Sequence, residues 1–340
     1  MQVRLGKTEI IVNKDGFGAL PIQRIQAEDA ILLLRHAYEG GMDFFDTARS
    51  YTDSEEKMGL ALSSVRDKIV IATKTPASNA EGFWKDLETS LHNLKTDHID
   101  IYQFHNPPFC PKPGGEDGLY DAMLQAKAEG KVLHIGITNH RLHVAKEAIE
   151  SGLYETIQFP LCYLATKKDL EIVSMAKEAD MGFIGMKSLS GGLITNVKAA
   201  AAFAAQFDHV IPIWGIQREW ELNEFLAYID TFPQMDEEIE AFIEQEKISL
   251  AGDFCRSCGY CLPCPAGIDI PQAARMSQLI RRSPSQRFLK EEWQEKMFQI
   301  RDCLQCGHCK SKCPYSLDTP TLLQKNLRDY EAILEGRTEI

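Results

Sequence analysis

The chain has 340 residues, of which 44% are hydrophobic and 25% charged, values that are ordinary for a globular protein. Its formal net charge of -12 disfavours nucleic acid as a partner, because binding to phosphate backbones needs a basic surface. No apolar run approaches the roughly 18 residues of a membrane-spanning helix, and the first residues lack the order of a signal peptide. We therefore expect a cytoplasmic protein without a membrane partner.

The first 215 residues alternate short apolar segments with amphipathic segments of helical spacing. Nearly continuous apolar strands must be covered on both faces, which favours a closed, parallel (β/α)8 TIM barrel. An open, doubly wound sheet is the alternative. Residues 1–12 are expected to form a small hairpin that caps the barrel floor. Strands are expected at residues 17–20, 43–48, 69–74, 98–105, 133–139, 156–160, 182–187 and 209–215.

Three neighbouring strands end in polar residues, and the active sites of such barrels lie at the carboxyl ends of their strands. The second strand ends in Asp46 with Tyr51 just beyond it, the third ends in Lys74, and the fourth ends in His105. Each residue alone has an ordinary interpretation, as a helix cap, a packed ring, a solvated amine or a core histidine. A strand-terminal lysine beside apolar neighbours, however, needs a partner such as Asp46.

These four residues together indicate proton chemistry at a carbonyl group. Lys74, paired with Asp46, is expected to lower the pKa of Tyr51 from its ordinary value of about 10. Tyr51 then donates a proton to a carbonyl oxygen while His105 hydrogen-bonds and orients the same oxygen. The expected reaction is reversible reduction of a carbonyl group.

Residues 1–230 resemble the aldo-keto reductase family. The resemblance rests on RLGKTEI and FGAL near the start, followed by DTARSY, ATK, QFHN, GITN and IQFP. It implies a (β/α)8 barrel that uses a nicotinamide cofactor without a metal at the reacting carbon. It also implies a catalytic tetrad formed by Asp46, Tyr51, Lys74 and His105.

The same resemblance implies residues that contact the nicotinamide. Thr138, Asn139 and Gln158 would hold its carboxamide group, although ordinary hydrogen bonding at strand ends is the alternative. After the seventh strand the family usually has an aromatic residue that stacks on the ring, whereas this chain has Met186 and Lys187. A methionine can also pack on a ring face, so binding is compatible with this departure.

Two further segments are expected to contact the rest of the cofactor. Ser188, Gly191 and Gly192 suit close approach of the backbone to a pyrophosphate, because glycine leaves space and exposes amide groups. After the last strand, where the family commonly has a basic residue for a 2′-phosphate, this chain has Gly215, Gln217 and Arg218. The cofactor is therefore predicted as NADP or NAD, with the choice left open.

Eight of the ten cysteines lie in two runs between residues 255 and 313, behind an acidic helical link. In a reducing compartment such clustering indicates metal binding rather than disulfides. The gaps of two, two and three residues in the second run, followed by proline, are those of bacterial ferredoxins. We predict a barrel domain over residues 1–235 and a mainly helical ferredoxin-like domain over 236–340. The predicted ligands are Cys255, Cys258, Cys261, Cys264, Cys303, Cys306, Cys309 and Cys313.

Two 4Fe-4S clusters are predicted, with the fourth cysteine of each run ligating the other cluster. One cluster takes Cys255, Cys258, Cys261 and Cys313, and the other takes Cys264 with the first three cysteines of the second run. Zinc is the alternative, since paired cysteines also form tetrahedral sites. The long helical stretch between the runs resembles helical dicluster ferredoxins and the iron-sulfur tail of one branch of aldo-keto reductases.

The motifs are compatible with three functions. The leading prediction is an NAD(P)H-dependent enzyme for a small aldehyde, ketone or alcohol substrate, with clusters that are structural or redox-active. The alternative is electron transfer to or from a ferredoxin-like or flavin partner, which the complete set of eight cysteine ligands keeps open. One-electron clusters would then need a relay such as a flavin to exchange electrons with a hydride donor. A sensor that uses the barrel to bind a ligand is disfavoured by the complete tetrad.

Overall fold

The computed structural model describes residues 1–249, 255, 257, 259–282, 285–313 and 317–338. The chain divides into two compact units. The first comprises Met1–Leu189 and Asn196–Ile239, and the second comprises Ser190–Thr195 and Glu240–Ile340. The domain limits of 1–235 and 236–340 therefore remain our proposal, with the added observation that the short segment Ser190–Thr195 belongs to the second unit.

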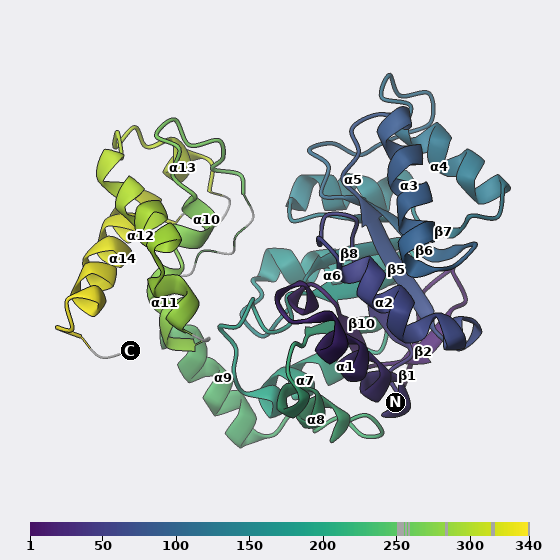
Figure 1. Cartoon of the computed structure of the whole chain (residues 1–340), viewed down its shortest axis with the longest axis horizontal. Coiled ribbons are helices and arrows are strands. Elements are labelled where there is room, and N and C mark those ends of the chain that lie inside the picture. Colours follow the sequence, from purple (N-terminus) through teal and green to yellow (C-terminus); the bar gives the residue numbers. More distant parts are fainter. Residues whose placement is uncertain (250–254, 256, 258, 283–284, 314–316, 339–340) are drawn as a thin grey trace. The chain divides into compact units, whose positions relative to one another are not determined.

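The first unit is a closed barrel of eight parallel strands (Figure 1). The predicted barrel is confirmed, and the open sheet is wrong because the last strand pairs with the first and closes the ring. Each predicted strand segment overlaps one observed strand. The strands are β3 (Gly16–Gly18), β4 (Phe44–Asp46), β5 (Val70–Thr75), β6 (Ile99–His105), β7 (Val132–Thr138), β8 (Thr156–Pro160), β9 (Gly182–Met186) and β10 (Val210–Gly215).

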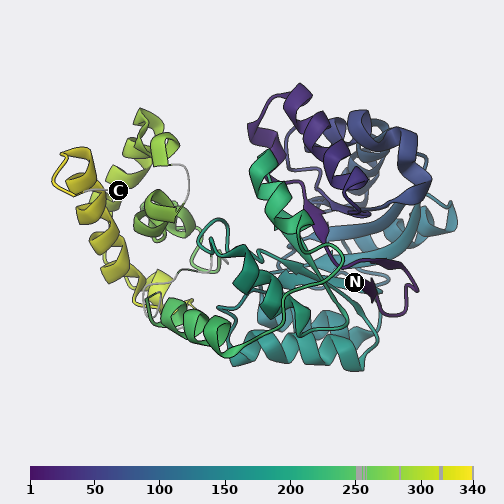
Figure 2. The same ribbon diagram turned by 90° about the horizontal axis from the view of Figure 1, so that it is seen from below.

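Helices cover the outside of the barrel (Figures 1 and 2). In the first of them Ala30, Leu33, Leu34 and Ala37 are buried, which is the spacing of one helix face against the strands. The helices are α1 (Ala27–Glu39), α2 (Ser54–Leu62), α3 (Ala80–Leu94), α4 (Leu119–Ala128), α5 (Leu142–Ser151), α6 (Lys167–Glu178), α7 (Val197–Ala205), α8 (Glu219–Leu226) and α9 (Glu237–Ser249), the last crossing into the second unit.

The N-terminal residues form the predicted hairpin, an antiparallel pair of β1 (Gln2–Arg4) and β2 (Ile11–Asn13). Its apolar side chains Val3, Leu5 and Val12 are buried in one cluster with interior side chains of the strands. The hairpin thus caps the interior of the barrel, as expected.

Among its described residues the second unit consists of helices and loops (Figures 1 and 2). The long helix α14 contacts each of four others, and their apolar side chains form one core. The helices are α10 (Ile270–Ala273), α11 (Met276–Arg282), α12 (Glu291–Phe298), α13 (His308–Ser311) and α14 (Thr319–Leu334), joined by 3-10 turns at Ser285–Leu289 and Gln299–Asp302. Within the described ranges, every helix is too short or too polar to cross a membrane.

Candidate functional site

The four predicted catalytic residues meet at one end of the barrel. Asp46 is the last residue of β4, Lys74 lies near the end of β5, and His105 is the last residue of β6. Tyr51 lies in the loop between β4 and α2. Because parallel strands present their carboxyl ends at the same rim, adjacent strands bring these side chains together.

Lys74 and Asp46 form a buried ion pair, each almost without solvent exposure. The Lys74 Nζ donates to Asp46 Oδ1 at 2.7 Å, to Asp46 Oδ2 at 2.8 Å and to the Thr47 carbonyl at 2.5 Å. These bonds use all three hydrogens of an ammonium group. Burial raises the pKa of Asp46 and lowers that of Lys74, and their mutual attraction opposes both shifts.

The Tyr51 ring lies near Lys74 of this ion pair and near His105. The Lys74 Nζ is 5.4 Å from the centroid of the Tyr51 ring. The Tyr51 and His105 rings meet edge to face, with centroids 5.8 Å apart and an interplanar angle of 81°. The phenol and the imidazole are thus neighbours at the rim, where a carbonyl group can reach both.

The predicted direction of the Tyr51 pKa is wrong. Burial and the Asp46 carboxylate raise the pKa of this phenol above its ordinary value. The prediction paired Lys74 with Asp46 but left out the burial of the phenol and the opposing effect of the Asp46 carboxylate, which binds Lys74 through two hydrogen bonds. Tyr51 is therefore a neutral phenol throughout the physiological range and is ready to donate its proton.

His105 is neutral at physiological pH, because burial and the charge of Lys74 lower its pKa to about 3. Its role then depends on which ring nitrogen carries the hydrogen. Ser50 Oγ lies 3.2 Å from His105 Nδ1. If the hydroxyl donates to Nδ1, Nε2 bears the hydrogen and can donate it to a carbonyl oxygen. Ser50 was missed in the sequence, although its place beside Tyr51 in DTARSY was a signal.

A buried carboxylate anchors the loop that carries Tyr51. Glu55, at the start of α2, accepts hydrogen bonds from Thr73 Oγ1 and Ser90 Oγ, both at 2.7 Å. It also forms an ion pair with Arg49, two residues before Tyr51. The loop is thereby tied to β5 and α3, which limits the positions that the Tyr51 hydroxyl can take.

The residues predicted to hold the nicotinamide carboxamide lie near this rim and already have partners in the chain. Asn139 accepts from the Arg141 backbone amide at 2.8 Å and donates to the Pro107 carbonyl at 2.8 Å. Thr138 Oγ1 lies 3.8 Å from Met186 Sδ, and Met186 packs with the barrel interior. An amide group has two donors and two acceptor positions, so Asn139 keeps one of each for a ligand and fits the predicted role.

The predicted pyrophosphate segment is divided between the two units. Ser188 belongs to the barrel, and its hydroxyl donates to the Gly185 carbonyl at 2.9 Å. Gly191 and Gly192 belong to the second unit, where the buried Arg275 donates to the Ser190 carbonyl at 2.5 Å. A methyl group on Gly191 would lie 3.0 Å from the Arg275 guanidinium, so the arginine packs directly against this glycine.

Lys187 and Ser190 have φ angles of +58° and +50°, in the left-handed region that non-glycine residues rarely adopt. Lys187 is half-buried. The segment after β9 therefore has an unusual backbone path, consistent with a binding loop.

The region after β10 pairs its basic residue with an acid. Gly215 ends the strand and is exposed. The backbone amides of Gln217 and Arg218 donate to Glu221 Oε2 at 2.9 and 3.0 Å, and the Arg218 guanidinium lies 3.5 Å from Glu221 Oε1. A 2′-phosphate at this position would meet a guanidinium whose charge is partly offset.

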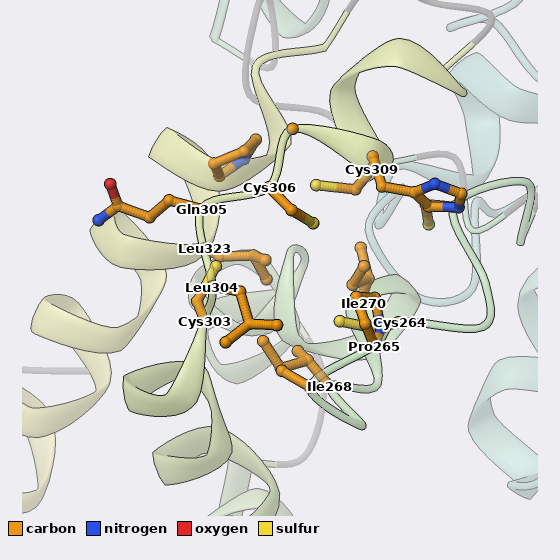
Figure 3. Close-up of a pocket in the computed structure, with 15 residues that line it drawn as sticks. Cys264, Pro265, Ile268, Ile270, Cys303, Leu304, Gln305, Cys306, Cys309 and Leu323 are labelled. Carbon is orange, nitrogen blue, oxygen red and sulfur yellow. The ribbon is translucent and has the colours of Figure 1, made fainter.

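Five cysteines line one cavity in the second unit, namely Cys261, Cys264, Cys303, Cys306 and Cys309. In Figure 3 the sulfur atoms of Cys264, Cys303, Cys306 and Cys309 point toward the space between them. These four are the set that we predicted for one cluster, whereas Cys261, which lines the same cavity, was predicted for the other. Burial raises the pKa of the Cys309 thiol, and the neighbouring Cys303 and Cys306 thiolates add to the shift. Thiolates that oppose one another in this way fit a cationic iron core, which would stabilise their charges.

Among the described residues, no group of three cysteine, histidine or acidic side chains is arranged to hold a single metal ion. Of the other predicted ligands, Cys255 is buried and Cys261 and Cys313 are partly buried beside the helical core. Cys258 lies outside the described residues.

Comparisons with known proteins agree with both parts of the chain. The model of the aldo/keto reductase family matches residues 15–251, and that of a 4Fe-4S dicluster domain matches residues 254–318. L-galactose dehydrogenase from Arabidopsis thaliana is 26% identical over 284 residues, which cover 72% of this chain and 89% of the relative. A methylglyoxal reductase from Escherichia coli is 29% identical over 209 residues, covering 57% of this chain and 75% of the relative.

A solved structure shows the same fold. An aldo-keto reductase from Bacillus halodurans, in its holo form, superposes with a TM-score of 0.63. The match covers 72% of this chain and 95% of that chain, at 19% sequence identity. At this identity the likeness concerns the barrel architecture alone.

Proposed function

Because the chain belongs to the aldo/keto reductase family and carries a 4Fe-4S dicluster domain, we propose that it reversibly reduces an aldehyde or ketone to an alcohol with NAD(P)H. The observation that carries this proposal is the placement of Tyr51 and His105 at one rim with the Lys74–Asp46 pair beside them. The names of the two relatives, one acting on L-galactose and one on methylglyoxal, agree with a small carbonyl or alcohol substrate.

In this proposal the chain's residues handle the carbonyl oxygen. A bound nicotinamide supplies hydride to the carbonyl carbon. Tyr51 donates its phenolic proton to the oxygen, so that hydride and proton together yield the alcohol. His105, neutral and hydrogenated at Nε2, donates a hydrogen bond to the same oxygen and orients it. The Lys74–Asp46 pair lies beside the Tyr51 ring and would hold it in position for this transfer.

Asn139, Thr138, Gln158 and Ser188 would hold the cofactor at the barrel rim, and Arg218 would lie near its adenosine end. Because Glu221 partly offsets the Arg218 charge, both NADP and NAD stay candidates. In the second unit, Cys264, Cys303, Cys306 and Cys309 would ligate one 4Fe-4S cluster. Cys255, Cys258, Cys261 and Cys313 would ligate the other.

The test is turnover of a panel of aldehydes and ketones, including methylglyoxal, by the intact protein and by Tyr51→Phe. We expect kcat/KM to fall by about 10²- to 10⁴-fold in the variant, because the proton donor is lost. Nicotinamide binding, followed by quenching of protein fluorescence, should change little. Equal turnover by both proteins would refute the assignment of Tyr51.

Electron transfer is a second candidate function, favoured by the exposure of Cys306 at the cysteine cavity. A cluster ligated by an exposed residue lies near the protein surface, where a ferredoxin-like or flavin partner can exchange electrons with it. Anaerobic protein mixed with NADPH or NADH, without a carbonyl substrate, tests this. Bleaching of the iron-sulfur absorbance would support electron exchange, and an unchanged spectrum would favour clusters with a structural role.

A further inference from the structure

The barrel interior contains a fully buried amide beneath the candidate active site. Gln103 lies on β6, two residues before His105, so both side chains point to the same side of the strand. In the barrel register its Cα is paired with that of Lys74 on β5 and with that of Gly136 on β7. Gln103 therefore lies in the same interior layer as the catalytic lysine.

Gly136 lets the Gln103 side chain cross β7. A methyl group on Gly136 would lie 2.8 Å from Gln103 Cγ and 2.4 Å from the Thr156 hydroxyl, distances that real side chains do not adopt. Without it, Gln103 Nε2 reaches Gln158 on β8 and donates to its Oε1 at 2.9 Å. The absence of a side chain on β7 thus joins β6 to β8 through the barrel interior.

The amide of Gln158 continues this path to the catalytic aspartate. Its Nε2 donates to Asp46 Oδ1 at 3.4 Å, and Oδ1 is also one of the two oxygens that bind Lys74. Gln103 and Gln158 are both almost fully buried, so no bulk water replaces these contacts. One chain of hydrogen bonds therefore runs from Gln103 through Gln158 and Asp46 to Lys74.

We propose that Gln103 is a positioning residue for the reaction, acting through Gln158 to hold the Asp46 carboxylate in its ionised form against Lys74. This inference rests on the proposed function, since it concerns the residues assigned to proton transfer. It gives Gln158 a role within the chain in addition to the predicted contact with the nicotinamide.

The physical reason is the cost of a buried charge. Burial raises the pKa of Asp46, and the charge and hydrogen bonds of Lys74 together with the hydrogen bond from Gln158 act against that rise. Gln103 acts in the same direction by binding the Gln158 amide. Loss of the amide donors therefore favours protonation of Asp46. A protonated Asp46 is neutral and no longer stabilises the positive charge of Lys74. The other titratable groups near this pair are Tyr51, His105 and Glu55, whose pKa values or charges are coupled to Asp46 or Lys74.

The test is Gln103→Leu, which keeps the size of the side chain and removes the amide. The pH midpoint of Asp46 protonation is followed by the infrared carbonyl band of the protonated acid, assigned by its loss in Asp46→Asn. We expect the midpoint to move upward by about one pH unit, the size of one hydrogen bond to a carboxylate. In activity assays the acid limb of kcat should move in the same direction, with KM for the carbonyl little changed.

Thr156→Val is the matched control, because it removes a fully buried hydroxyl from the same layer that makes no bond to Asp46. It should leave the midpoint unchanged. Equal midpoints in Gln103→Leu and wild type would overturn the proposal. Equal upward shifts in Gln103→Leu and Thr156→Val would also overturn it, because packing alone would then explain the effect.

Two further variants extend this test. If Gln103→Leu fails to fold, Gln103→Met offers a flexible side chain of similar length that lacks the amide. If Gln103 acts through Gln158, the double variant with Gln158→Leu should shift the midpoint no further than Gln158→Leu alone. The infrared titration needs neither cofactor nor substrate, so its failure is distinguishable from failure of the proposed reaction.

Discussion

The candidate active site of the barrel and the cysteine cavity of the second unit are organised in different ways. In the barrel, Asp46 and Lys74 are held by strands and bind each other directly. In the second unit, Cys264, Cys303 and Cys306 lie outside the regular helices, and only Cys309 lies on one, the short α13. The barrel thus supplies the partners of its own charges, whereas the thiolates oppose one another and need a cation. Catalysis in the barrel should therefore be sensitive to the loss of single hydrogen bonds. The folded structure of the second unit should instead depend on its bound clusters.

The largest expected effect comes from Lys74→Met, which removes one partner of the buried pair. An uncompensated Asp46 carboxylate should lower the free energy of unfolding of the barrel by about 3–5 kcal/mol. Turnover should fall by about 10²- to 10⁴-fold. Denaturant unfolding and initial rates measure the two effects.

The double variant Asp46→Asn, Lys74→Met separates the effect on stability from the effect on turnover. Two neutral groups of similar size should recover most of the stability but none of the activity. The iron content should match wild type in both variants. If Lys74→Met unfolded with the same free energy as wild type, the ion pair would make no contribution to the stability of the barrel.

A smaller effect is expected from Ser50→Ala. Without the hydroxyl near Nδ1, His105 can place its hydrogen on either nitrogen, so we expect kcat to fall by roughly 3- to 10-fold. Nitrogen NMR of the histidine ring reports the tautomer directly. Ser50→Thr, which keeps a hydroxyl, should preserve both the tautomer and the rate. An unaltered tautomer in Ser50→Ala would contradict this role.

The smallest expected change in turnover comes from the second unit. Cys306→Ser removes one ligand of one cluster, so we expect the iron content to fall by about half. Turnover of the barrel should then change by less than about twofold, if its site is organised independently of the clusters. Cys162→Ser, outside both cysteine runs, is the control and should keep all its iron. Full iron in Cys306→Ser would contradict the ligand assignment.

Much of this structure was predictable because its signals are local. Eight apolar segments mark the strands, and polar residues at their ends mark Asp46, Lys74 and His105. The regular spacing of cysteines likewise predicts the cavity around Cys264 and Cys306.

The features that escaped prediction depend on contacts between distant residues. Gln103 was not singled out in the sequence, and only the register places it across Gly136 from Gln158. The raised pKa of Tyr51 follows from the burial of its ring and from the nearby Asp46 carboxylate, which spacing along the chain does not reveal. These are three-dimensional properties of the barrel interior.

The segment Ser190–Thr195 has a consequence for how the gene can be divided. It is encoded within the barrel, between β9 and α7, yet Leu193 is fully buried in the core of the second unit and Arg275 binds the Ser190 carbonyl. A fragment ending at Ile239 would encode all eight barrel strands and the whole tetrad. It would also leave an apolar side chain and a backbone carbonyl without the partners that the intact polypeptide provides. Exchange of the C-terminal region between homologous genes would therefore have to carry this internal segment with it.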